Sequence, residues 1–186
     1  MSTSEPRPAA ALGFLTVIEH EQHGLLGGYL VLNSTGRPLE FHCTSGVRPN
    51  RAQAILFGPT LDAYLYGEQI GQALVNKSTL KPAVICTNQS QVLALREFVA
   101  TPVLLIESDD ASEANGVTYR VDGAHAGVPQ QCLLRRGAFR VSMSSDHASD
   151  RPRVEEYLAT LSESFDLIEP FARIHGALEE AQRGAK

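Results

Sequence analysis

Two short and almost wholly apolar runs constrain the fold of this chain more than any other feature. They are "PAVICTN" (82–88) and "TPVLLIES" (101–108). Apolar runs of this length, without alternation, are typical of central strands that are covered on both faces. The stretch between them, "SQVLALREFV" (90–99), suits the helical crossover that parallel pairing requires, and Ser90 suits its N-cap. We therefore expect a parallel strand pair inside an α/β domain.

The preceding residues predict three more strands, joined by polar turns. The strand segments are "GFLTVIE" (13–19), "LLGGYLVL" (25–32) and "PLEFHCT" (38–44), and the turns are "HEQHG" and "NSTGR". Short turns between successive strands predict an antiparallel meander. A short helix over 50–57 and a longer one from Pro59 to Lys77 are expected next. In the longer helix, Gly67 and Gly71 allow a close approach, either to a partner helix or to this chain's own sheet.

Three antiparallel strands followed by helix, strand, helix and strand is the element order of the ribonuclease H-like fold. This similarity of topology covers residues 13–107, and a fold does not determine a function. Weaker strands are expected at "VTYRV" (117–121) and "CLLRRGAFRVSM" (132–143), and helices from 151 to 184. The last helix has a capping-box-like start at Asp166 and Glu169, and an apolar stripe formed by Leu167, Phe171, Ile174 and Leu178.

The length of the chain fits one domain with a proper core. At 186 residues we expect a disordered tail over 1–12 and a single α/β domain over 13–186, whose C-terminal segment, about 151–184, is helical. No apolar run approaches the roughly 20 residues of a membrane span. The N-terminal "MSTSEPRPAAALG" has no long apolar run, so we do not expect it to be a secretory signal. Cys43, Cys86 and Cys132 lack any CxxC spacing, which indicates small buried side chains in a reducing compartment. We therefore expect a cytoplasmic protein.

The charge balance argues against an electrostatic footprint for nucleic acid. The formal net charge is −5, whereas nucleic-acid-binding surfaces are usually basic. We do not expect a nucleic-acid partner on this basis, and the lack of a long apolar run argues against a membrane partner.

Two segments resemble an uncharacterised bacterial protein family. They are "GRPLEFHCTSGVRPNRAQAILFG" (36–58) and "FDLIEPFARIHGALEEA" (165–181). The resemblance implies no known activity, cofactor or catalytic residue.

The pair formed by His42 and Cys43 raises the question of a nucleophilic dyad. Successive side chains of a strand point to opposite faces, so Cys43 shares a face with the apolar Leu39 and Phe41, and His42 shares the other with Glu40. We expect Cys43 to face the core, where burial raises a thiol pKa and makes it inert. The two residues then cannot act together.

The turn "EHEQH" contains the richest group of polar side chains, Glu19, His20, Glu21 and His23. Imidazoles and carboxylates are zinc and iron ligands, and His20, His23, His42 and Glu19 form the candidate metal set. A polar hairpin turn without a metal is the simpler interpretation, because the spacing matches no known site.

The ribonuclease H-like order also raises the possibility of a nuclease. Two-metal cleavage of phosphodiesters needs several carboxylates, which that fold draws from the first strand, the first long helix, the end of the fourth strand and a later helix. Here the first strand has no acid before Glu19, the fourth ends in the neutral Thr87 and Asn88, and the long helix offers Glu68. The acidic loop with Asp109, Asp110 and Glu113 lacks the spacing of an EF-hand.

These observations favour a non-catalytic binding or adaptor protein without a cofactor, acting through a protein partner or self-association. Its interaction surface would be the stripe formed by Leu167, Phe171, Ile174 and Leu178. The alternative is a metal-dependent hydrolase or nuclease-like enzyme that uses a divalent metal, the "EHEQH" turn, His42 and Glu68. A small-ligand sensor is a third possibility without a residue pattern of its own.

Overall fold

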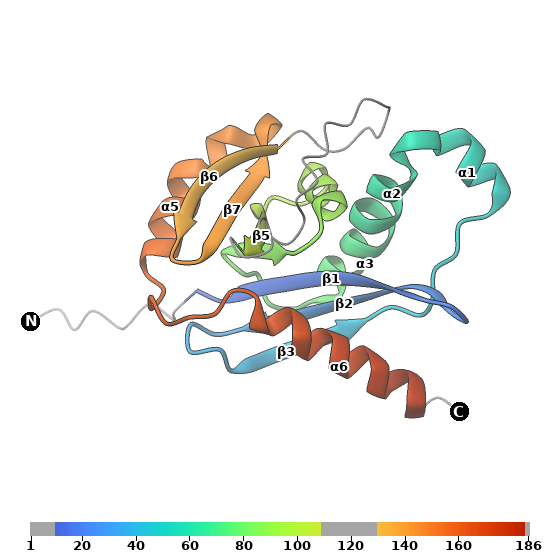
Figure 1. Ribbon diagram of the computed structural model, residues 1–186, viewed down its shortest axis with the longest axis horizontal. Helices are drawn as coiled ribbons and strands as arrows, with labels where there is room; N and C mark the ends of the chain where they lie inside the picture. Colours follow the sequence, from blue (N-terminus) through green and yellow to red (C-terminus); the bar gives the residue numbers. More distant parts are fainter. Residues whose placement is uncertain (1–9, 109–129, 185–186) are drawn as a thin grey trace, which may run out of the picture.

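Seven strands form one mixed sheet in the computed structural model, which describes residues 10–108 and 130–184 (Figure 1). Its order is β3-β2-β1-β4-β5-β7-β6. The strands β1 and β4, and β4 and β5, pair in parallel, and all other neighbours are antiparallel. The predicted meander and parallel pair are confirmed. The strands are β1 (Leu12–His20), β2 (Gly24–Leu32), β3 (Pro38–Cys43), β4 (Val84–Thr87), β5 (Val103–Ser108), β6 (Gln130–Arg136) and β7 (Phe139–Ser144).

Helices cover both faces of the sheet, so the molecule has three layers (Figure 1). The first face packs against α5 (Arg151–Ala159) and α6 (Glu169–Gly184), which follow η4 (Ser145–Asp150). The second face packs against η2 (Tyr64–Gly71), α3 (Gln72–Lys77) and η3 (Ser90–Glu97). Because β4 lies inside the sheet with an apolar layer on each side, all of its residues are buried, as its unbroken apolar run predicts.

The helix expected from Pro59 to Lys77 forms, but it changes type along its length. After α1 (Arg51–Phe57) come η1 (Gly58–Thr60), α2 (Leu61–Ala63), the π-helical η2 and then α3. A Cβ on Gly67 would lie 2.8 Å from the backbone nitrogen of Leu95 and 2.9 Å from the Cβ of Ala94. The predicted close approach is therefore to η3 of the same chain, and not to the sheet.

The crossover between β4 and β5 is a 3-10 helix, η3, and the predicted N-cap is wrong. The residue that precedes η3 is Gln89, and Ser90 is the first residue inside it. Gln89 makes no capping hydrogen bond because its side chain bonds to β1 instead.

Asp166 caps the start of α6 as predicted, but the Glu169 side chain does not complete a capping box and accepts a hydrogen bond from Arg173 instead. Asp166 Oδ1 accepts hydrogen bonds from the backbone nitrogens of Ile168 at 2.7 Å and Glu169 at 3.0 Å. The apolar stripe of this helix packs over β1 and β2, where Gly28 leaves room for Ile174. All four residues of the expected interaction surface are buried in this core, so that prediction is corrected: Leu167, Phe171, Ile174 and Leu178.

The prediction that Cys43 faces the core is wrong. Cys43, Leu39 and Phe41 share a face as alternation requires, but all three are exposed. The reason is the position of β3 at the edge of the sheet, whereas α6 packs over β1 and β2. Cys86 is buried as expected, and burial raises the pKa of its thiol to about 12.

Some sequence predictions lie outside the described residues. They are most of the N-terminal tail, the strand "VTYRV" and the acidic loop with Asp109, Asp110 and Glu113. The strand segment 132–143 divides into β6 and β7, which meet at Gly137 with a φ of 58°. Within residues 10–108 and 130–184, none of the helices has the length and apolar character needed to cross a membrane.

Candidate functional site

The turn between β1 and β2 is held in one conformation by the segment that follows β3. The backbone nitrogen of His23 donates to the His20 carbonyl at 3.2 Å, and Gly24 adopts a φ of 78° that favours glycine. Arg48 Nη2 donates to the carbonyl oxygens of Glu21, at 3.0 Å, and Gln22. The polar "EHEQH" sequence therefore forms a hairpin turn whose exposed carbonyls are bound by a guanidinium.

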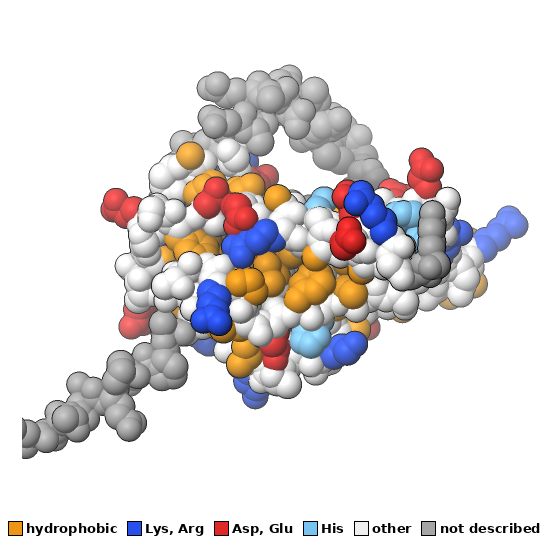
Figure 2. Space-filling view, turned by 90° about the horizontal axis from the view of Figure 1, so that it is seen from below, with side chains coloured by type: hydrophobic (Ala, Val, Ile, Leu, Met, Phe, Trp, Pro, Cys, Tyr) orange, Lys and Arg blue, Asp and Glu red, His pale blue; other side chains and the backbone are white. Residues whose placement is uncertain are grey.

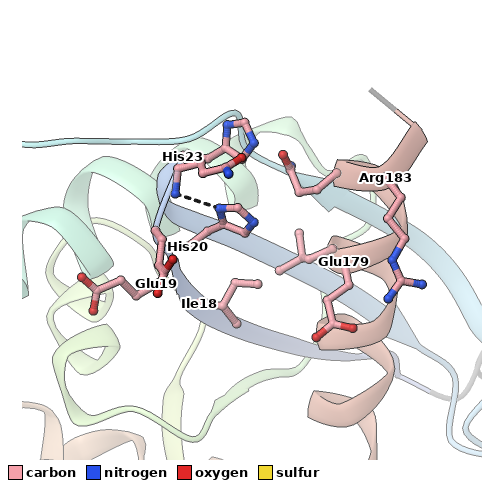
Figure 3. Close-up of a pocket in the computed structure, with 10 residues that line it drawn as sticks. Ile18, Glu19, His20, His23, Glu179 and Arg183 are labelled. Carbon is pink, nitrogen blue, oxygen red and sulfur yellow. Dashed lines mark hydrogen bonds between the residues drawn. The ribbon is translucent and has the colours of Figure 1, made fainter. Parts of the chain in front are cut away.

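The imidazoles of His20 and His23 lie against one another in this turn. Their ring centroids are 4.7 Å apart, with planes tilted by 40°. The backbone nitrogen of Gln22 donates to His20 Nδ1 at 3.2 Å, which is the dashed line in Figure 3. Since Nδ1 accepts this bond, the proton of neutral His20 resides on Nε2, which remains available as a donor. Among the described residues, no hydrogen bond to the His23 ring is present.

A pocket of about 530 Å³ lies between this turn and the C-terminal part of α6 (Figure 3). Figure 2 shows acidic, basic and histidine side chains gathered beside the end of that helix. Alternation along β1 puts Ile18 and His20 on the side of α6, and the Glu19 side chain is directed away from the helix (Figure 3). The lining residues are Ile18, Glu19, His20, Glu21, Gln22, His23, Leu178, Glu179, Gln182 and Arg183.

The candidate metal set does not converge. In residues 10–108 and 130–184, no three or more His, Cys, Asp or Glu side chains are grouped so that they could hold a metal ion. The set fails because His42 lies within β3, paired with Tyr29 of β2, whereas His20 and His23 lie at the end of the hairpin. His20 and His23 are brought together, and His42 is not brought to them.

His42 belongs to a second polar cluster, centred on Glu40. Its Nε2 lies 3.4 Å from Glu40 Oε2, and the carboxylate also accepts hydrogen bonds from the hydroxyls of Ser78 and Thr79, just after α3. The bonds from Ser78 and Thr79, with a smaller contribution from His42, lower the pKa of Glu40 to about 2. This carboxylate joins the edge strand β3 to the end of α3, which is a structural role.

Glu68, the second residue of the alternative catalytic pair, is half-buried in η2. The described part of the chain contains no hydrogen bond or ion pair between Glu68 and His42. The residues that sequence reasoning missed are Glu179, Gln182 and Arg183 of α6. No pattern connects them to the turn, because only the packing of α6 over β1 and β2 brings the two segments together.

Comparison with solved structures gives the fold. The structure of human ENDOV matches over 100% of this chain and 91% of its own, at 10% sequence identity and a TM-score of 0.51. The catalytic domain of human Endonuclease V matches over 100% of this chain and 89% of its own, at 13% identity and a TM-score of 0.48. A Ciona intestinalis Endonuclease V, in complex with a DNA that contains an inosine, matches over 92% of this chain and 86% of its own, at 9% identity and a TM-score of 0.47. The fold is therefore ribonuclease H-like, as the element order predicts.

Neither a family model nor a curated protein matches the chain. The resemblance to an uncharacterised bacterial family therefore stays a prediction.

The match to human ENDOV corrects two expectations. The interpretation as a non-catalytic adaptor relied on missing motifs, and the match to human ENDOV contradicts it in favour of the nuclease-like alternative. The expectation of a protein partner or self-association in place of nucleic acid is corrected together with it. The physical reason is that net charge describes the whole surface and says little about one local site.

Proposed function

We propose that this protein is a nuclease-like hydrolase that cleaves phosphodiester bonds in nucleic acid. The pocket between the β1–β2 turn and α6 is its candidate active site. The observation that carries the proposal is the juxtaposition of His20 and His23, 4.7 Å apart between ring centroids, with Arg183 lining the same pocket.

The position of the pocket in the fold supports this assignment. In open α/β sheets, ligands bind outside the carboxyl ends of the strands. The pocket lies just beyond the carboxyl end of β1, where that strand ends at His20. The fold is also the one in which human ENDOV is built.

The two histidines have different roles in the proposed reaction. His20 has its Nδ1 occupied by the Gln22 amide, so its Nε2–H is a fixed donor toward a phosphoryl oxygen. His23 lies beside it, and a ring nitrogen can accept the proton of the attacking hydroxyl or water as the new P–O bond forms. The protonated ring then returns this proton to the ester oxygen that leaves as the old P–O bond breaks. Arg183 supplies positive charge where negative charge develops on the phosphoryl group.

The carboxylates of the pocket suggest how a divalent cation would take part. Mg²⁺ is often bound by one or two carboxylates together with substrate phosphates, without a full protein cage. Glu21 and Glu179 line the pocket and are the carboxylates available for such an ion. A bound cation would supply neutralisation of the phosphate charge. We further propose a cytoplasmic location, on the cysteine usage of the sequence.

The experiment is a cleavage assay with the full chain. End-labelled single- and double-stranded DNA and RNA oligonucleotides are incubated with Mg²⁺, Mn²⁺, Zn²⁺ or a chelator, and the products are separated by electrophoresis. General acid–base groups contribute about 100-fold or more to a rate, so we expect His20→Ala and His23→Ala each to lose about that factor.

The matched control is His175→Ala, an exposed histidine of α6 that does not line the pocket. This variant is expected to keep the wild-type rate. No cleavage of any oligonucleotide under any ion condition would contradict the proposal, as would cleavage that survives both His20→Ala and His23→Ala.

A further inference from the structure

The parallel strands β1 and β4 separate at a small group of neutral polar side chains. The last residues paired between them are Leu15 and Thr87, after which β4 ends and β1 continues to His20. The backbone of β1 beyond Leu15 therefore lacks a strand partner on the side of β4. Thr16, the next residue of β1, is buried.

The side chain of Gln89 replaces the missing strand. Its Oε1 accepts a hydrogen bond from the backbone nitrogen of Val17 at 2.8 Å, and its Nε2 donates to the Val17 carbonyl at 2.7 Å. A primary amide has the same donor and acceptor pair as a peptide group. Gln89 thus extends the pairing of β1 beyond the end of β4.

A second hydrogen bond, between Thr16 and Asn88, joins β1 to the end of β4 beside the Gln89 side chain. The Thr16 hydroxyl donates to Asn88 Oδ1 at 2.8 Å, and the Thr87 hydroxyl accepts from the Gln89 backbone nitrogen at 3.2 Å. The amide oxygens of both Asn88 and Gln89 are therefore already engaged. We name Thr16, Thr87, Asn88 and Gln89 the neutral seam.

The neutral seam joins the first strand to the end of the fourth, two of the elements from which the ribonuclease H-like scaffold draws carboxylates. Two-metal phosphodiester cleavage depends on carboxylates that hold ions about 4 Å apart. Here the first strand contributes a hydroxyl and the residues after the fourth contribute amides, which are hydrogen-bonded to the Thr16 hydroxyl or to the Val17 backbone. The residues do not fit a divalent metal centre.

From this disagreement we infer that the neutral seam is a closed structural element that excludes divalent cations, so that this position of the scaffold is not a metal site in this chain. The inference does not rest on the proposed function. The pocket proposed for cleavage lies elsewhere in the molecule, because His20 is about 13 Å along β1 from Thr16 at a rise of about 3.3 Å per residue.

The test uses paramagnetic broadening by Mn²⁺ in the isotope-labelled full chain. The ion is titrated at substoichiometric amounts, and amide signals are followed by two-dimensional NMR. We expect the amides of Val17, Asn88 and Gln89 to broaden no more than those of the sheet interior. Selective broadening of these three amides would overturn the inference.

A variant tests whether the lack of negative charge is the reason that the neutral seam excludes divalent cations. Asn88 is exposed and its replacement by aspartate is nearly isosteric, so Thr16 can still donate to the new carboxylate. We expect Asn88→Asp to introduce Mn²⁺-dependent broadening at the Gln89 amide, which the wild type lacks. Equal spectra for both proteins would show that neutrality does not exclude the ion, and would overturn the inference. Ser90→Asp, at the first residue of η3, serves as a charge-matched control that is expected to leave the Val17 amide unbroadened.

Discussion

Removing the Gln89 side chain should destabilise the whole fold, although Gln89 is only half-buried and lies outside the apolar core. In Gln89→Ala, the Val17 N–H and C=O each lose a partner at 2.8 and 2.7 Å. Val17 is 2% exposed, so water reaches its backbone poorly. Each unsatisfied buried group costs about 1–3 kcal/mol, which gives about 2–6 kcal/mol in the free energy of unfolding for the pair.

Urea unfolding followed by circular dichroism measures this loss. For a chain of this size, a loss of about 3 kcal/mol lowers Tm by about 6–12 °C. Gln91→Ala is the matched control, because Gln91 lies in the same η3 and its side chain has only a marginal 3.5 Å contact with Ser90. We expect the control to change the unfolding free energy by less than about 0.5 kcal/mol.

An isosteric variant separates hydrogen bonding from packing. Gln89→Glu places a carboxylate oxygen against the Val17 carbonyl, which raises the pKa of the new carboxyl in the folded state. A carboxyl whose pKa is raised in the folded state stabilises that state below the pKa of the unfolded chain, about 4.3. This stabilisation is lost as pH rises through the pKa of the folded state. Gln89→Glu should therefore approach wild-type stability in acid and fall below it at neutral pH. Equal midpoints for Gln89→Ala and Gln91→Ala would refute the reasoning.

Three other predictions follow from the packing and the polar clusters. Leu178→Ala removes a fully buried side chain under α6 and should lower the free energy of unfolding by about 2–5 kcal/mol. The control, Leu56→Ala, lies at an 82% exposed position and should lower it by less than about 0.5 kcal/mol, and calorimetry of both variants measures the difference. The pKa of Glu40 is lowered to about 2, so the stabilisation of the folded state by its carboxylate is present above the ordinary pKa of 4.5 and is lost as pH falls through about 2. When the free energy of unfolding is measured against pH in acid, Glu40→Gln should lack this loss. A pH dependence equal to that of the wild type would contradict the prediction. A Cβ on Gly46 would collide with the His23 carbonyl, so Gly46→Ala should shift the imidazole NMR signals of His23; unchanged signals would show that the turn is held by other contacts.

The sheet could be predicted from the sequence because its strands follow simple burial patterns. The apolar runs of β4 and β5 indicate strands covered on both faces, and the structure buries all four residues of β4. Alternation also assigns Cys43 and His42 to opposite faces. It does not say which face a helix covers, and this is why Cys43 proved to be exposed.

The candidate site could be predicted only in part. His20 and His23 are close in the sequence, so their proximity follows from the turn itself. Glu179 and Arg183 reach the pocket only through the packing of α6, whose apolar stripe predicts a buried face but not its position on the sheet. The pairing of Gln89 with β1 could not be predicted for a similar reason, since its partner is the backbone of Val17 in a strand far away in the sequence.

Mapping where nucleic acid binds is the measurement that tests the account most directly. A short oligonucleotide with uncleavable phosphorothioate linkages is titrated into the isotope-labelled chain, and amide shifts are recorded by NMR. The account predicts shifts at His20, His23 and Gln182, with the amides of Asn88 and Gln89 unchanged. Shifts centred on Asn88 and Gln89, or none anywhere, would contradict it.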